Sequence, residues 1–154
     1  MTHLRSRPSP RPLLLLAPLL LIAGCASVPM ESAQEDARGK QFTPPPPDKG
    51  SLYVFRRGPT GGVATIPVTI AGSLQTALAS DTWVWLEGAP ATIDVRCAGT
   101  DGGADTTVKV GPGEIRFVEV AYRPGLMGTR CAVQEVPVSQ GQPAVLAGRR
   151  AVGP

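Results

Sequence analysis

The stretch Ala91-Thr92-Ile93-Asp94-Val95-Arg96-Cys97 alternates apolar and polar residues and is the clearest strand in the chain. Successive side chains of a strand point to opposite faces, so this alternation predicts one buried face and one wet face. Short runs rich in valine, isoleucine, threonine and aromatic residues lie on both sides of it, separated by glycine and proline. These runs cover residues 51–57, 65–71, 74–78, 82–86, 105–110, 115–122 and 129–136.

No segment shows a convincing helical period, so the sequence predicts an all-β domain over residues 49–137. About seven to nine short strands with turn-rich connections favour a single antiparallel β-sandwich over a small barrel, which would bury the same alternate residues. Residues 138–154 are small, weakly apolar and interrupted by proline and glycine. We expect them to form a flexible C-terminal tail, in which Ala144 to Leu146 are at most a short docked piece.

The amino-terminal residues 1–24 have the organisation of an export signal. Arg5, Arg7 and Arg11 precede an apolar run that is too short to cross a bilayer, and small residues then precede Cys25. Ile22-Ala23-Gly24-Cys25 resembles the bacterial lipoprotein signal, which implies cleavage between Gly24 and Cys25 and lipidation of Cys25. An ordinary cleaved leader or a chance cysteine is the alternative.

Residues 25–48 contain few large apolar side chains and end in four consecutive prolines, Pro44 to Pro47. A segment that buries little apolar area stays disordered, and consecutive prolines favour an extended rod. The sequence therefore predicts a flexible proline-rich tether behind the lipidated Cys25. A ligand for a proline-recognition domain is the alternative interpretation of the prolines.

Charge and histidine content exclude several functions. Without the three leader arginines, twelve Lys and Arg balance twelve Asp and Glu, so the basic patch of a nucleic-acid binder is not expected. The single histidine, His3, lies in the leader, which leaves no imidazole for a nucleophile–histidine relay or a typical catalytic zinc site. We predict no catalytic residues, no metal site and no cofactor.

Cys97 and Cys131 remain once Cys25 is lipidated, and both lie on predicted strands. Disulfides persist in exported proteins, so a structural Cys97–Cys131 bridge between neighbouring strands is the leading interpretation. Two buried free thiols are the main alternative. A redox or metal pair is disfavoured because the spacing is not CxxC and no histidine is at hand.

Trp83 and Trp85 are two residues apart in a predicted strand and therefore point the same way. They form either a ligand platform for a sugar ring or a peptide, or an aromatic pair that seals the core. The core interpretation is the commoner arrangement.

Three stretches resemble a family of small bacterial envelope lipoproteins whose shared domain has no assigned function: Gly50 to Arg56, Pro67 to Gly72, and Leu86 to Val95. The last is also similar to the hairpin of PEGA-type surface β-sandwiches, and Val110 to Phe117 is similar to the turn and aromatic strand that follow. The resemblance implies a sandwich displayed from a lipid anchor and brings no active residues.

The sequence thus predicts a noncatalytic interaction or structural module, anchored to the membrane by lipid and facing the periplasm. Ala26 after the cysteine resembles the pattern sorted to the outer membrane of Gram-negative envelopes. Envelope proteins or the cell wall are the expected partners. An inhibitor or accessory factor of a cell-wall hydrolase is the alternative, and a carboxylate-based enzyme would need two facing acids in a cleft.

Overall fold

The computed structural model describes residues 28–58 and 64–154. The predicted leader, its cleavage site and Cys25 lie outside the described residues. The strands are β1 (Gly50–Arg56), β2 (Ile66–Ile70), β3 (Leu74–Leu78), β4 (Thr82–Gly88), β5 (Ala91–Cys97), β6 (Ala104–Val110), β7 (Ile115–Pro124), β8 (Thr129–Val136) and β9 (Arg149–Arg150). The helices are α1 (Ala33–Gly39) and α2 (Val138–Ala147). No helix of the described chain is long and apolar enough to cross a membrane.

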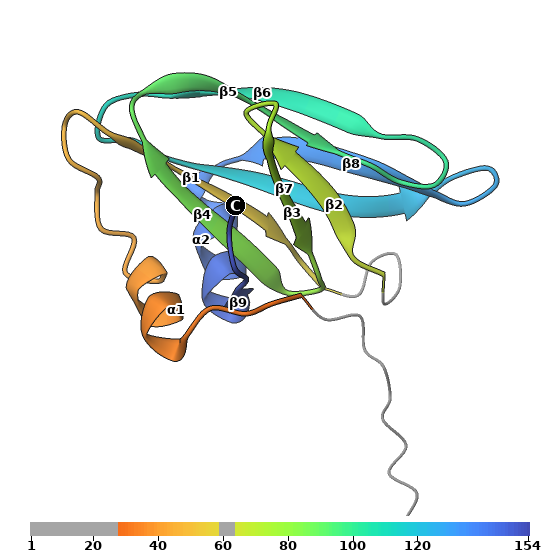
Figure 1. Cartoon of the computed structure of the whole chain (residues 1–154), viewed down its shortest axis with the longest axis horizontal. Coiled ribbons are helices and arrows are strands. Elements are labelled where there is room, and N and C mark those ends of the chain that lie inside the picture. Colours follow the sequence, from red (N-terminus) through yellow and green to blue (C-terminus); the bar gives the residue numbers. More distant parts are fainter. Residues whose placement is uncertain (1–27, 59–63) are drawn as a thin grey trace, which may run out of the picture.

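The strands form two sheets that share one core (Figure 1). The prediction of an all-β domain is thus confirmed only in that the chain is mostly β, because α1 and α2 were not predicted. A five-stranded sheet has the order β8-β7-β1-β4-β9, and a four-stranded sheet has the order β3-β2-β5-β6. The core between them is almost entirely aliphatic and draws on both sheets, for example Val54 and Val118 from one and Ile70 and Val95 from the other. These four side chains are fully buried.

The β5–β6 hairpin confirms the alternation read from Ala91 to Cys97. Its register pairs Ala91 with Val110 and Cys97 with Ala104. Val95 and Cys97 are buried in the core, whereas Asp94 and Arg96 are exposed on the other face.

The prediction of purely antiparallel sheets is wrong for the five-stranded sheet. β1 lies parallel to β7, and β4 lies parallel to β9. A parallel pair needs a long crossover between its strands, and β2 to β6 supply that crossover between β1 and β7. Strand alternation reports which face is buried but carries no information about strand direction, so the sequence pattern did not reveal this pairing.

The prediction of a disordered tether over residues 25–48 is wrong for the described part, residues 28–48. Met30 forms an antiparallel bridge with Ala151, and α1 follows. The helix begins at the cap residue Ser32, whose hydroxyl accepts a hydrogen bond from the backbone N–H of Glu35 at 3.2 Å. Polar contacts dock this segment together with a few isolated apolar side chains, Val28, Met30 and Phe42, so its low overall hydrophobicity was misleading.

The contacts that dock the start of α1 come from the last strand, β9. The Arg150 backbone N–H donates to Asp36 Oδ1 at 2.6 Å, and Arg150 Nη1 lies 2.8 Å from Glu35 Oε2. Burial opposes ionisation of Asp36, but hydrogen bonds from Lys40 and from the Arg150 N–H outweigh it and lower the pKa of this carboxyl. The ends of the described chain are thus joined by charge-assisted hydrogen bonds.

The prediction of a flexible tail over residues 138–154 is also wrong, because α2 and β9 are ordered elements. Figure 1 shows both helices on the side of the five-stranded sheet that faces away from β5 and β6. Gly141 of α2 sits directly against the Phe117 ring, and Val145 is fully buried. Gly141 and Pro143 weaken the helical pattern in the sequence, but the small residue allows the close approach.

Candidate functional site

The aromatic side chains gather on the outer face of the five-stranded sheet, opposite the aliphatic core. The chain has three Phe, two Tyr and two Trp. All except Tyr122 lie in one cluster, which we call the outer aromatic cluster: Phe42, Tyr53, Phe55, Trp83, Trp85 and Phe117. Because this cluster covers one face of β1 and the aliphatic core covers the other, every residue of β1 is buried.

Trp83 is a fully buried member of this cluster. Its ring centroid lies 5.8 Å from that of Tyr53, and Gly39 at the end of α1 packs directly on its edge. Its indole Nε1 is buried without a hydrogen-bond partner among the described residues. Trp83 is therefore a core residue and cannot offer a face to a ligand.

Trp85 is half-buried and forms the edge of the cluster. It stacks on Tyr53 with centroids 5.9 Å apart and ring planes at 9°, and its Nε1 donates to Ser51 Oγ at 3.2 Å. The guanidinium carbons of Arg38 and Arg150 lie 5.2 and 5.1 Å from its ring centroid. Both distances suit cation–π attraction, which fixes this ring in place.

A hollow of about 240 Å³ opens beside Trp85, and we call it the Trp85 hollow. Its lining combines two aromatic rings, two prolines and two charged groups: Arg38, Thr43, Pro44, Pro46, Tyr53, Trp85 and Glu87. The tetraproline stretch is thus one wall of a surface hollow in the described chain. Aromatic and proline surfaces with one cation and one anion at the rim suit a peptide or a sugar ring.

The Tyr53 hydroxyl is already committed inside the protein. It donates to the Gly39 carbonyl at 2.9 Å, and burial raises the pKa of Tyr53 to about 12. The phenol therefore stays protonated near neutral pH and does not act as a base. Its role is to hold the end of α1 against the sheet.

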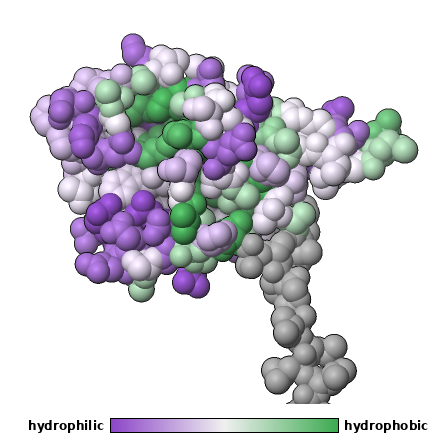
Figure 2. All heavy atoms as spheres, in the orientation of Figure 1, coloured by the Kyte–Doolittle hydropathy of each residue, from purple (hydrophilic) through white to green (hydrophobic). Residues whose placement is uncertain are grey.

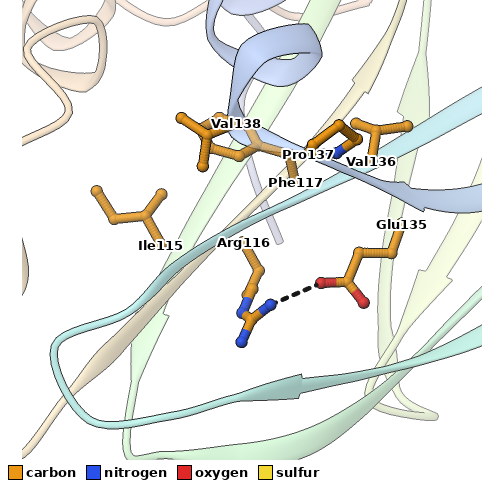
Figure 3. Close-up of a pocket in the computed structure, with 7 residues that line it drawn as sticks. All are labelled: Ile115, Arg116, Phe117, Glu135, Val136, Pro137 and Val138. Carbon is orange, nitrogen blue, oxygen red and sulfur yellow. Dashed lines mark hydrogen bonds and ion pairs between the residues drawn. The ribbon is translucent and has the colours of Figure 1, made fainter.

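A second hollow, of about 410 Å³, lies where β7, the end of β8 and the start of α2 meet (Figure 3). Figure 3 shows apolar side chains, including Ile115 and Val138, along one side and the Arg116–Glu135 ion pair on the other. Arg116 Nη1 lies 3.2 Å from Glu135 Oε1, and Arg116 Nη2 lies 2.8 Å from Glu114 Oε2. Arg116 is thus held between two carboxylates.

A metal centre or a two-acid cleft would require several acidic or soft ligands in one place. Among the residues that the structure describes, no three His, Cys, Asp or Glu side chains form a metal-binding group. Each of the two hollows is lined by one carboxylate, Glu87 in the first and Glu135 in the second. Glu135 is paired with a guanidinium, so neither hollow presents two facing acids.

The Cys97–Cys131 disulfide predicted from the sequence is present, with Cα atoms 6.0 Å apart. It joins β5 of the four-stranded sheet to β8 of the five-stranded sheet, so it links the two sheets rather than neighbours in one sheet. The loop after Cys97 adds two backbone hydrogen bonds to β8: Asp101 N–H to the Thr129 carbonyl at 2.9 Å and Cys131 N–H to the Gly102 carbonyl at 3.0 Å. The disulfide and these two hydrogen bonds thus join the two sheets at this corner of the domain.

The sequence singled out both tryptophans, and the structure separates their roles. The partners of Trp85, which are Tyr53, Arg38 and Arg150, were not predicted. Tyr53 had a readable signal, because it lies in the predicted strand 51–57. Arg38 and Arg150 come from segments that were predicted to be disordered. The sequence pattern of those segments therefore did not indicate that the two arginines contact Trp85.

Comparisons with protein-family models, with curated proteins and with solved structures find no match to this chain. The resemblance to small envelope lipoproteins and to PEGA-type sandwiches therefore stays a prediction.

Proposed function

We propose that this protein is a lipid-anchored lipoprotein of the bacterial outer membrane, facing the periplasm, whose β-sandwich serves as a noncatalytic interaction or structural module. The observation that carries the proposal is the disulfide between Cys97 and Cys131. Such bonds form and persist in exported proteins and are rare in the reducing cytosol. A leader that ends in Ile22-Ala23-Gly24-Cys25 supplies the matching export signal.

The docked amino-terminal segment determines how this module would sit on the membrane. The described chain begins at Val28, and Met30 is already paired with Ala151. An extended chain spans about 3.5 Å per residue, so a lipidated Cys25 would lie within about 10 Å of Val28. The module is then held close to the leaflet instead of being lifted away on a long tether.

The Trp85 hollow is the part of the module that suits a partner. Its walls combine the Trp85 ring with Pro44 and Pro46, and Arg38 and Glu87 provide one charge of each sign. Such a surface can recognise an extended peptide or a glycan segment without chemical turnover. Envelope proteins and the cell wall present both kinds of ligand.

A substitution at the anchor tests the proposal. Wild-type chain and Cys25→Ser are expressed in a Gram-negative host, and membrane and periplasmic fractions are compared by immunoblot. We expect the wild type in the outer-membrane fraction as a processed, acylated species and Cys25→Ser as an unacylated precursor. Ser27→Ala serves as the control and should behave as the wild type. An unchanged molecular weight and unchanged fractionation of Cys25→Ser would contradict lipidation.

A further inference from the structure

Two large apolar side chains stand at the tip of the β7–β8 hairpin, which we call the β7–β8 tip (residues 125–128). Leu126 and Met127 are each 90% exposed, far more than any other exposed large apolar residue of the described chain. Figure 2 shows a hydrophobic tip at the far right, set apart from the body of the molecule. Adjacent exposed apolar residues on a projection mark a surface that meets something apolar.

The exposure of these side chains is built into the loop. Asp101 Oδ2 accepts hydrogen bonds from the backbone N–H groups of Leu126 at 2.5 Å and Met127 at 3.3 Å. Within the tip, the Gly125 N–H donates to the Gly128 carbonyl at 2.8 Å. Asp101 lies in the loop after Cys97, and this loop is hydrogen-bonded to β8 close to the Cys97–Cys131 disulfide. The tip is therefore preorganised, and presenting its two apolar side chains costs little further ordering.

Two arginines stand at the base of this tip. Arg123 of β7 and Arg130 of β8 are directly opposite each other in the register, and both are exposed. Like charges directly opposite each other destabilise a strand pair, and an anion bound beside them relieves the repulsion. An anionic leaflet has its phosphates at the water side and its acyl chains deeper inside. An apolar tip with a pair of cations behind it matches this order of layers.

We propose that the β7–β8 tip is a second membrane contact, in which Leu126 and Met127 enter an anionic leaflet and Arg123 and Arg130 bind the headgroup phosphates. This inference rests on the proposed lipid anchor, because an anchor within about 10 Å of Val28 keeps the module at a leaflet. In Figure 1 the described chain begins at the lower side of the molecule, and the β7–β8 hairpin projects to the right. Stable attachment to a membrane requires two contributions. Here the lipid on Cys25 would be the first, and the contact of the β7–β8 tip would be the second.

Oxidation of Met127 tests this contact separately from the anchor. The acylated envelope form is reconstituted into vesicles of phosphatidylcholine with or without phosphatidylglycerol, and flotation first checks anchoring. A water-soluble oxidant is then added together with a free methionine peptide, and sulfoxide at Met127 is measured by mass spectrometry. On anionic vesicles we expect Met127 to oxidise at least threefold more slowly than the peptide, with weaker protection on phosphatidylcholine alone.

The Arg123→Gln/Arg130→Gln variant should lose the extra protection on anionic vesicles. Leu146→Ser, which removes an exposed apolar side chain of α2, is the matched control and should leave Met127 protected. Oxidation of Met127 at the peptide's rate in a protein that floats would overturn the tip contact and leave the anchor intact. Protection only after envelope proteins are added would also overturn it, in favour of a protein cleft. Failure to float would count against the proposed function itself.

Discussion

Met30 forms an antiparallel bridge with Ala151, so the beginning and the end of the described chain lie side by side at the edge of the five-stranded sheet. Two backbone hydrogen bonds flank the bridge: Glu31 N–H to the Arg150 carbonyl at 3.0 Å and Val152 N–H to the Pro29 carbonyl at 2.8 Å. This pairing extends the sheet beyond β9. Segments on either side of the strand-rich region therefore belong to the domain.

Amide hydrogen exchange should detect this pairing directly. We expect the amides of Glu31 and Val152 to exchange slowly, because both donate to backbone carbonyls within the extended sheet edge. Asp36→Ala removes the acceptor of the Arg150 N–H and should speed exchange at the amides of Glu31, Arg150 and Val152. Exchange of Glu31 at the rate of an unstructured peptide would restore the tether interpretation.

Small residues under the two helices should be sensitive to enlargement. A Cβ at Gly39 would overlap the Trp83 ring, and one at Gly141 would overlap the Phe117 ring. Overpacking of this kind costs about 1–3 kcal/mol, so Gly39→Ala and Gly141→Ala should lower the free energy of unfolding by that amount. Gly88→Ala is the matched control, since a Cβ there meets nothing within 4 Å. Equal stability of all three variants in urea titrations would show that the helices are not docked.

The inter-sheet disulfide should be a major stabilising element. Its cysteines are 34 residues apart, and closing a loop of that size stabilises the fold by about 3–4 kcal/mol in the chain-entropy model. We expect Cys97→Ala/Cys131→Ala to lower the free energy of unfolding by up to that amount. Reduced wild type should unfold at nearly the same urea concentration as the variant. If reduction left the wild-type midpoint unmoved, the bond would have no stabilising role.

Acid should weaken the contact between Glu119 of β7 and Arg57. Arg57 Nε and Nη2 lie 2.8 and 2.6 Å from the two Glu119 carboxylate oxygens, and this hydrogen bonding lowers the pKa of Glu119 from its ordinary 4.5. A carboxyl whose pKa is lower in the folded state stabilises the fold above its unfolded pKa, and this contribution is lost as pH falls through the folded value. Stability of the wild type should therefore fall more steeply below about pH 4.5 than that of Glu119→Gln. Parallel pH profiles of the two proteins would contradict this role.

The strands were predictable because alternation reports a local property, namely which side chains face the core. Val95 and Cys97 occupy the buried positions that the pattern gave them. The strands with which a given strand pairs come from distant parts of the sequence. The local pattern of β1 therefore did not indicate its parallel pairing with β7.

The two helices escaped prediction for a different reason. Helix α1 is held by Asp36 and Glu35 against Arg150, and helix α2 approaches the sheet through Gly141. Neither helix carries a strong apolar stripe, which is the signal that a sequence pattern detects. The Trp85 hollow is lined by Arg38 of α1 and by Pro44 and Pro46 that follow it, so only its strand residues could be predicted.

The intact mass of the protein purified from the cell envelope without reduction tests the central claim, a lipid-anchored and disulfide-linked module, most directly. We expect a single species that lacks residues 1–24, carries acyl groups on Cys25, and has lost the thiol hydrogens of Cys97 and Cys131. Mass spectrometry of the peptide that begins at Cys25 places the acyl groups. An envelope form that retains residues 1–24, or that starts elsewhere without acyl groups, would contradict the account.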